Sequence, residues 1–340
     1  IFGCVLSAGL GQSPARQAAL KAGLEHKTVT TTINKVCGSG IKAMMFAHDS
    51  IDSGSVNIVV AGGMESMSNA PYMLYKARDG YRMGHKKITD HMMIDGLEDA
   101  YENILMGCFA QTTADDKNLT RSDMDKFAIN SLSKALSAIE TGAFDNEIIP
   151  FDVKNRQGST LITTDEAPAS VRKDKISSLR PAFTKDGTIT AANASSISDG
   201  AAALVLMKQS TAKIKGLKPL CSIVAHASYA QAPQDFTLAP IGAINSLLAK
   251  ANWQVGDVDL WEINEAFAMV TMLAIDELQL DAAKVNVNGG ACALGHPLGA
   301  SGARIVTTLL HALIHRQLTK GIASLCIGGG EAVAIAIELS

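Results

Sequence analysis

Four short runs of apolar, largely β-branched residues constrain the fold of this 340-residue chain most strongly. Each run is bounded by glycine or polar residues, a pattern typical of central strands that are buried on both faces. Longer stretches with helical periodicity lie around them, at 41–51, 121–140, 240–251, 264–279 and 302–316. The apolar runs themselves are 56–60, 203–207, 322–327 and 333–337. Strands that alternate with helices in this way predict an α/β protein.

The sequence also contains a weak internal repeat. C-G-S-G at 37–40 begins a predicted helix, which is followed by a strand and A-G-G-M-E at 61–65. G-A-S-G at 299–302 begins another predicted helix, followed by a strand and G-G-G-E at 328–331. Charge is uneven as well, because residues 67–200 hold 16 Lys and Arg and 19 Asp and Glu. We therefore expect two related α/β halves, the first interrupted by a solvated insert.

Charge and hydropathy narrow the classes of partner. The net charge is −3, whereas nucleic-acid-binding proteins usually carry a basic excess, so we expect no nucleic-acid partner. No apolar run reaches the roughly 18 residues of a membrane-spanning helix, and the first residues lack the basic and apolar regions of a signal peptide. These features predict a cytoplasmic globular protein with no membrane partner.

The segment N-K-V-C-G-S-G-I-K-A-M at 34–44 places Cys37 where an extended stretch gives way to a helix. A helix N-terminus presents unpaired N–H groups and the positive end of its dipole, which lower the pKa of a thiol. Gly38 and Gly40 allow a substrate and neighbouring backbone to come close. Cys37 is therefore a candidate nucleophile, and a buried structural cysteine is the alternative.

Two glycine-rich segments near the end of the chain contain further candidate catalytic residues. In N-V-N-G-G-A-C-A-L-G-H-P-L-G-A-S-G-A-R (286–304), His296 precedes Pro297 and a predicted helix. Its imidazole suits a base or an N–H donor to an oxyanion, and a structural loop histidine is the alternative. In S-L-C-I-G-G-G-E (324–331), Cys326 ends a strand and Gly328 begins a tight turn whose N–H groups can face a negative oxygen.

The segment W-E-I-N-E-A-F-A at 261–268 places Asn264 and Glu265 where a strand leads into a predicted helix. Either side chain could take part in a site. Capping of the helix is the simpler interpretation, because short polar side chains accept hydrogen bonds from the first N–H groups of a helix.

The six cysteines form no recognisable disulfide or metal pattern. No C-x-x-C pair occurs, and a chain of this length needs no disulfide to fold. His311 and His315 lie four residues apart on a predicted helix, but no Glu or Cys is spaced to complete a zinc site with them. We expect a surface histidine pair and no metal site.

Taken together, these four segments resemble the thiolase family. N-x-x-C-G-S-G, N-E-A-F-A, G-G-A-x-A-L-G-H-P-x-G-A-S-G-A-R and C-I-G-G-G occur in the family's order and near its spacing. The similarity covers essentially the whole chain, and continues at 61–71, 95–101, 179–183 and 192–203. It implies the thiolase fold: two duplicated mixed-sheet α/β halves in a layered αβαβα arrangement, with an inserted loop domain.

The resemblance also implies limits for the domains. Residues 1–67 and 199–217 would form the first half, and residues 218–340 the second. Residues 68–198 would form a loop domain that covers coenzyme A, and within it 69–85 match the family's lid and tetramer-forming segment. Members of the family normally carry a strand and a helix ahead of the position of Ile1.

Individual residues receive roles by the same resemblance. Cys37 matches the nucleophile that becomes acylated, His296 the residue that activates it, and Cys326 a second cysteine that acts as general acid and base. Asn264 matches the side chain that holds a water in one oxyanion hole beside His296, and the N–H groups of Cys37 and Gly328 match the other hole. Six more positions match the lining of the coenzyme A tunnel: Leu97, Met106, Phe183, Ala194, Ser195 and Phe267.

These roles imply an acyltransferase that joins two acetyl-CoA molecules reversibly into acetoacetyl-CoA and CoA, by a ping-pong Claisen condensation through an acyl-Cys37 intermediate. A longer-chain 3-ketoacyl-CoA thiolase of fatty-acid degradation is the nearest alternative, and a non-catalytic thiolase-like protein that binds acyl-CoA or lipid is another. Ketoacyl-acyl-carrier-protein synthases fit less well, because they use a second histidine where this chain has Cys326. Coenzyme A thioesters are the substrates, no metal or redox cofactor is expected, and the family implies a homotetramer.

The chain departs from short-chain biosynthetic members of the family in two places. It has L-M-G at 105–107 where those members often have His-Met-Gly, which leaves the acyl-chain preference open. Pro168 occupies the place of a basic residue near the adenine end, so we expect the nucleotide to contact other residues such as Arg172 or Lys173.

Overall fold

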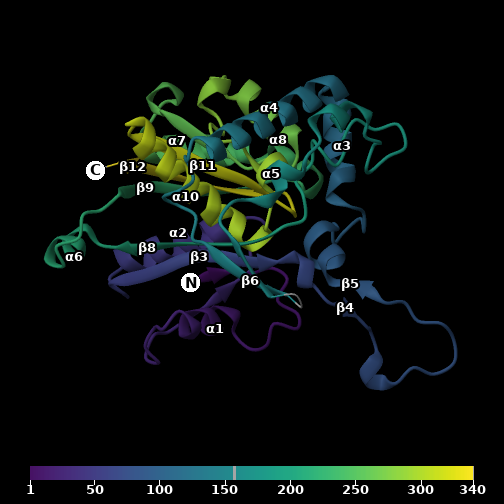
Figure 1. The fold of residues 1–340 in the computed structure, drawn as a ribbon, viewed down its shortest axis with the longest axis horizontal. Helices are drawn as coiled ribbons and strands as arrows, with labels where there is room; N and C mark the ends of the chain where they lie inside the picture. The colour runs from purple at the N-terminus through teal and green to yellow at the C-terminus, as the bar shows by residue number, and fades with distance from the viewer. Residues whose placement is uncertain (156–157, 340) are drawn as a thin grey trace.

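A computed structural model describes residues 1–155 and 158–339, and its core contains two mixed sheets (Figure 1). The first sheet has the strand order β2-β1-β3-β8. Its strands are β1 (Phe2–Gly3), β2 (Thr32–Ile33), β3 (Ile58–Ser66) and β8 (Asp199–Met207). β1 runs parallel to both β2 and β3, and β8 runs antiparallel to β3 with Ala61 opposite Leu204.

The second sheet repeats this plan. Its order is β10-β11-β12-β9, built from β9 (Cys221–Ala230), β10 (Leu260–Ile263), β11 (Lys320–Ile327) and β12 (Glu331–Leu339). β10 is parallel to β11, and β12 is antiparallel to both β11 and β9. Val285 forms a parallel bridge with Trp261 of β10, just as β2 pairs in parallel with β1 in the first sheet. The shared chain order and strand directions confirm the two related halves.

Two helices form a central layer between the sheets, α2 (Ser39–Asp52) and α10 (Leu298–Arg316) (Figure 1). The glycines of the internal repeat explain how closely these two helices pack. A Cβ placed on Gly302 would lie 2.5 Å from the backbone nitrogen of Ile41, and one on Gly40 would overlap the backbone nitrogen of Ala303. Glycine therefore permits the two helix backbones to touch.

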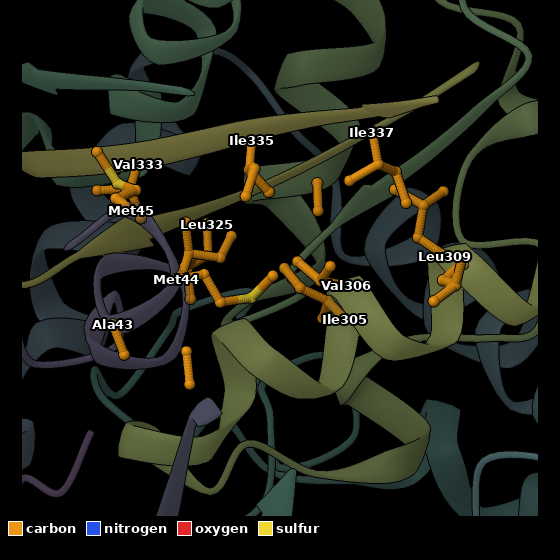
Figure 2. Close-up of a cluster of buried hydrophobic side chains, with 14 of the residues drawn as sticks. Ala43, Met44, Met45, Ile305, Val306, Leu309, Leu325, Val333, Ile335 and Ile337 are labelled. Atoms are coloured by element: carbon orange, nitrogen blue, oxygen red, sulfur yellow. The ribbon is translucent and has the colours of Figure 1, made fainter. Parts of the chain in front are cut away.

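The main core lies where this central layer meets the second sheet. Figure 2 shows side chains of α2 and α10 gathered against those of β11 and β12. Each large side chain buried in this way contributes roughly 1.5–3 kcal/mol to folding. The labelled members are Ala43, Met44, Met45, Ile305, Val306, Leu309, Leu325, Val333, Ile335 and Ile337, all of them buried.

The chain between β3 and β8 forms a separate set of elements beside the layered body. It contains the hairpins β4 (Tyr72–Met73) with β5 (Thr89–Asp90) and β6 (Phe151–Asn155) with β7 (Gly158–Ile162). It also contains α3 (Met106–Asp116), α4 (Arg121–Glu140) and α5 (Glu166–Ser170). The loop that joins β4 to β5 reaches away from the rest of the molecule as an arm (Figure 1).

The remaining helices flank the layers. α7 (Ala239–Ala251) packs on β9 and β12. The others are α1 (Pro14–Lys21), α6 (Gln209–Ile214), α8 (Ala268–Glu277) and α9 (Ala291–Leu294). Within the described ranges, no helix combines the length and apolar character that a membrane crossing requires.

Candidate active site

A strained turn precedes α2 and presents Cys37. Val36 adopts φ 47°, a left-handed conformation that β-branched residues rarely take and that costs about 1–3 kcal/mol. Two neighbours hold it in place: Asn34 Oδ1 accepts from the N–H of Val36 at 2.9 Å, and Ser39 Oγ donates to the Val36 carbonyl at 2.7 Å. Ser39 Oγ also accepts from the N–H of Lys35 at 2.8 Å. The N-x-x-C-G-S pattern therefore fixes the position of the cysteine.

The thiol of Cys37 lies between the two halves. Its side chain packs against the small apolar cluster that contains Leu298, as Leu97 also does, and burial raises the pKa of the thiol to about 11. The backbone N–H groups of Gly328 and of Cys37 itself act in the opposite direction, but they do not outweigh desolvation. The expectation that the helix N-terminus would lower the pKa of this thiol is therefore wrong, because burial has the larger effect.

His296 is buried and held on one side by hydrogen bonds. Its Nδ1 lies 2.6 Å from Ser301 Oγ, which donates its proton to the Pro297 carbonyl at 2.9 Å. Nδ1 must then carry the imidazole proton and donate to Ser301, which leaves Nε2 as a base. Nε2 is buried and has no hydrogen-bond partner among the described residues. Burial, with a smaller contribution from Arg304, lowers the pKa of His296 to about 4, so the ring is neutral at pH 7.

Asn264 lies beside His296 and does not cap a helix. Its backbone N–H donates to the Ser324 carbonyl at 3.0 Å, and its side-chain Nδ2 lies 3.4 Å from His296 Nδ1. α8 begins only at Ala268, with no side-chain cap, so the capping interpretation of Asn264 and Glu265 is wrong. Asn264 Oδ1 is a second buried polar atom without a partner among the described residues.

Cys326 completes the set at the end of β11. It is fully buried, and burial raises the pKa of its thiol well above the ordinary range. The nearby negative charge of a Cys37 thiolate raises it further, which places the two sulfur atoms in one electrostatic neighbourhood. After it, Gly329 and Gly330 adopt φ values of 91° and 87°, which confirms the tight turn that follows Gly328.

The residues matched to the coenzyme A tunnel lie around this point. Met106, Phe183, Ala194 and Phe267 share one apolar cluster with Cys326, and the rings of Phe183 and Phe267 meet edge to face with centroids 5.9 Å apart. The N–H of Ser195 donates to the carbonyl of Ala266 at 3.0 Å. Leu97 belongs instead to the small cluster around Cys37.

Two buried carboxylates hold the site together, and sequence reasoning assigned this role to neither of them. Glu65, at the end of β3, accepts from the N–H groups of Val5, Leu6 and Gly299 at 3.0, 3.0 and 2.8 Å. The signal was present, since a glutamate at the end of a buried apolar strand needs polar partners.

Glu265 is the second of these carboxylates. It accepts from Ser131 Oγ on α4 at 2.7 Å, from Asn286 Nδ2 at 2.8 Å and from the N–H of Cys292 at 3.1 Å. It therefore ties α4 to the loop that carries His296.

The fold and this site define a class of protein: a duplicated α/β protein whose two halves meet around two cysteines and a neutral buried histidine. Family models described as "Thiolase, N-terminal domain" and "Thiolase, C-terminal domain" match residues 1–210 and 217–339. The chain belongs to the thiolase family.

Several relatives are similar over nearly the whole chain. The acetyl-CoA acetyltransferases of Cupriavidus necator and Escherichia coli K12 are each 49% identical over 340 residues, which is 99% of this chain and 86% of the relative. The Acat5 thiolase from Ascaris suum, solved in complex with coenzyme A, has a TM-score of 0.93 at 44% identity and covers 100% of this chain and 87% of that one. The Bacillus anthracis acetyl-CoA acetyltransferase has a TM-score of 0.96 at 43% identity over 100% of this chain and 86% of that one. These likenesses confirm the predicted thiolase fold.

Proposed function

We propose that this chain is an acetyl-CoA C-acetyltransferase, which converts two acetyl-CoA molecules reversibly into acetoacetyl-CoA and CoA. The observation that carries the proposal is the closeness of Cys37 and Cys326, together with the neutral, buried imidazole of His296 in the turn that leads into α10. The names of the relatives at 49% identity support the same activity.

Acylation of Cys37 is the first step. With a thiol pKa of about 11, Cys37 holds almost no thiolate at pH 7, so its proton must leave as the sulfur attacks. Nε2 of His296 takes this proton, because Nδ1 is already protonated and committed to Ser301. The thioester carbonyl becomes an oxyanion that the N–H groups of Cys37 and Gly328 stabilise. The CoA thiolate then leaves and receives a proton from Cys326. This gives acyl-Cys37, free CoA and a Cys326 thiolate, while His296 keeps the Cys37 proton on Nε2.

Condensation is the second step, and Cys326 supplies its base. Acyl-Cys37 cannot ionise, so no thiolate at Cys37 opposes the negative charge that Cys326 now carries. The Cys326 thiolate removes a proton from the methyl group of a second acetyl-CoA. His296, together with a water held by Asn264, stabilises the enolate oxygen. The carbanion attacks acyl-Cys37, a carbon–carbon bond forms, and the departing Cys37 thiolate recovers its proton from Nε2 of His296, while Cys326 keeps the methyl proton and is again a thiol.

The acyl-CoA substrate is proposed to lie against Leu97, Met106, Phe183, Ala194, Ser195 and Phe267. Arg172 is exposed and Lys173 donates to Ser133 Oγ at 2.8 Å, and both remain candidates to meet the nucleotide phosphates. The proposed steps use only thiol, imidazole, amide and backbone groups, so they call for no metal or redox cofactor.

A homotetramer in the cytoplasm is part of the proposal. The arm between β4 and β5 carries several exposed apolar side chains, a pattern that favours contact with another chain. These side chains are Tyr72, Leu74, Tyr75, Tyr81, Met83 and Ile88.

Mass spectrometry after incubation with acetyl-CoA tests the enzyme directly. We expect one acetyl adduct that disappears in Cys37→Ala, and an adduct in Cys326→Ala that forms but does not condense. No adduct on the unaltered chain would favour the non-catalytic acyl-CoA-binding alternative, and condensation by Cys326→Ala would overturn the role of Cys326.

Steady-state rates of thiolysis of acetoacetyl-CoA and of a long-chain 3-ketoacyl-CoA distinguish the proposed activity from the remaining alternative. Strong preference for the longer substrate would favour the β-oxidation thiolase.

A further inference from the structure

A second polar cluster lies far from Cys37, at the other end of α2. It consists of His48 and Asp49 near the C-terminal end of that helix and His226 in β9. Ser39, two residues after Cys37, and His48 are separated by about 14 Å of rise along the helix axis. Asp49 and His226 are 177 residues apart in the sequence, so spacing along the chain gave no sign of this cluster.

The ligating atoms of the three side chains converge. Asp49 Oδ1 lies 2.9 Å from His226 Nε2 and 3.4 Å from His48 Nδ1, and all three atoms lie within 4.8 Å of one another. The two imidazole rings stand edge to face with centroids 5.1 Å apart, so their nitrogens approach the same carboxylate. Among the described residues, no other group of three His, Cys, Asp or Glu side chains meets in this way.

These distances fit a tetrahedral metal ion. Zinc binds imidazole nitrogen and carboxylate oxygen at about 2.0–2.2 Å, so two ligands of a tetrahedral site lie about 3.3 Å apart. The separations of 2.9 and 3.4 Å need only small side-chain adjustments to admit an ion. The side chains of His48, Asp49 and His226 are 34%, 59% and 16% exposed, so an ion can enter from solvent and a water can fill the fourth position.

We propose that His48, Asp49 and His226 bind a divalent transition-metal ion of the zinc class. Two imidazoles and one carboxylate form a donor set that zinc and its neighbours in the first row prefer over magnesium or calcium. The site joins the central helix of the first half to the edge strand of the second. Bound metal therefore stabilises the association of the two halves and takes no part in the reaction at Cys37. Lys250 lies near the cluster and its Nζ donates to the His226 carbonyl at 3.2 Å, while the negative charge of Asp49 acts on the same imidazole.

Titration of the full chain with Co²⁺ tests the proposal, because the colour of Co²⁺ reports both geometry and ligands. The chain has six free cysteines, and cysteine binding would show a sulfur-to-cobalt charge-transfer band. We expect one equivalent of Co²⁺ with tetrahedral visible bands and no charge-transfer band, displaced by Zn²⁺. The melting temperature should rise with the Zn²⁺ concentration.

Variants locate the ion. His226→Ala and Asp49→Asn should each weaken Co²⁺ binding about tenfold or more and abolish the rise in melting temperature. Asp49→Asn keeps the size of an exposed side chain, so it keeps the test valid even if His226→Ala folds poorly. His315→Ala, at an exposed histidine on α10, is the matched control and should change neither. No saturable binding, a thiolate band, or equal binding in the variants would show that the three residues form only a hydrogen-bonded surface cluster.

Discussion

The carboxylate of Glu65 accepts a hydrogen bond of 2.8 Å from the backbone N–H of Gly299, which joins β3 of the first half to the first turn of α10 in the second. The same carboxylate accepts from the N–H groups of Val5 and Leu6, so three backbone segments meet at one side chain. Gly299 follows His296 by three residues. Glu65 therefore sets where the first half places Cys37 relative to the histidine on the second half, although it lies outside the proposed reaction.

Glu65→Gln should lower the free energy of unfolding by about 1–3 kcal/mol, because one amide NH₂ must then face backbone donors that the carboxylate satisfied. Loosening of the loop should also lower the rate of Cys37 acylation. Urea unfolding and a single-turnover acetylation assay measure the two effects. Glu140→Gln, an exposed substitution at the end of α4, is the control. If the two variants unfold alike, the network around Glu65 carries no stability.

The sequence predicted the layered α/β plan well because it depends on local signals. The predicted helix at 121–140 is α4 to the residue, since Thr120 accepts from the N–H of Asp123 at 3.2 Å and Gly142 follows the end with φ 71°. Prediction was weaker where long-range contacts decide. The helical period places Leu136 on the same stripe as Met124 and Leu132, which are buried, yet Leu136 is 39% exposed because tertiary packing does not cover that end of the stripe.

The candidate site shows the same difference between features set by local sequence and features set by long-range contacts. Its cysteines, histidine and Asn264 could be picked out from local motifs, whereas the pKa of Cys37 could not, because desolvation depends on the packing of both halves. Glu65 and the His48–His226 pair were missed for a related reason: their partners are distant in the sequence.

Neutral His296 should make stability depend on pH. In the unfolded chain this ring takes up a proton below its ordinary pKa of 6.5, whereas in the fold it stays neutral down to about 4. Between these values the unfolded state binds more protons, so the free energy of unfolding falls as the pH falls through this window, by about 3 kcal/mol in all. Above pH 6.5 this contribution is fully present.

Comparison with His296→Asn isolates the contribution of this ring from those of other groups. The difference in unfolding free energy between the unaltered chain and the variant should shrink by about 3 kcal/mol from pH 7 to pH 4. Denaturant unfolding at several pH values measures it. A difference that does not change with pH would mean that His296 ionises alike in both states.

Gly40→Ala should destabilise the central layer, because the added Cβ would overlap the backbone of α10 at Ala303 and neither helix can move without disturbing both sheets. Overpacking of this kind costs about 1–3 kcal/mol or more. Gly256→Ala is the control, since a Cβ there meets nothing within 4 Å. Thermal unfolding compares the two. An equal melting temperature for both variants would contradict the close approach of α2 and α10.

Met106→Ala should change the acyl-chain preference, an outcome that rests on the proposed activity. The Cε of Met106 lies 3.6 Å from where a Cβ on Gly328 would stand, and its side chain packs in the cluster that contains Cys326. It therefore closes the space beyond the reacting carbon, and its removal leaves room for a longer acyl chain.

The ratio of kcat/KM for 3-ketohexanoyl-CoA to that for acetoacetyl-CoA should rise about tenfold, the scale of discrimination that a few methylenes provide in an apolar pocket. Ile214→Ala, 86% exposed on α6, should leave the ratio unchanged. An unchanged ratio in Met106→Ala would place the limit on chain length elsewhere, with Leu97 the next side chain to test because it packs against the same apolar cluster as Cys37.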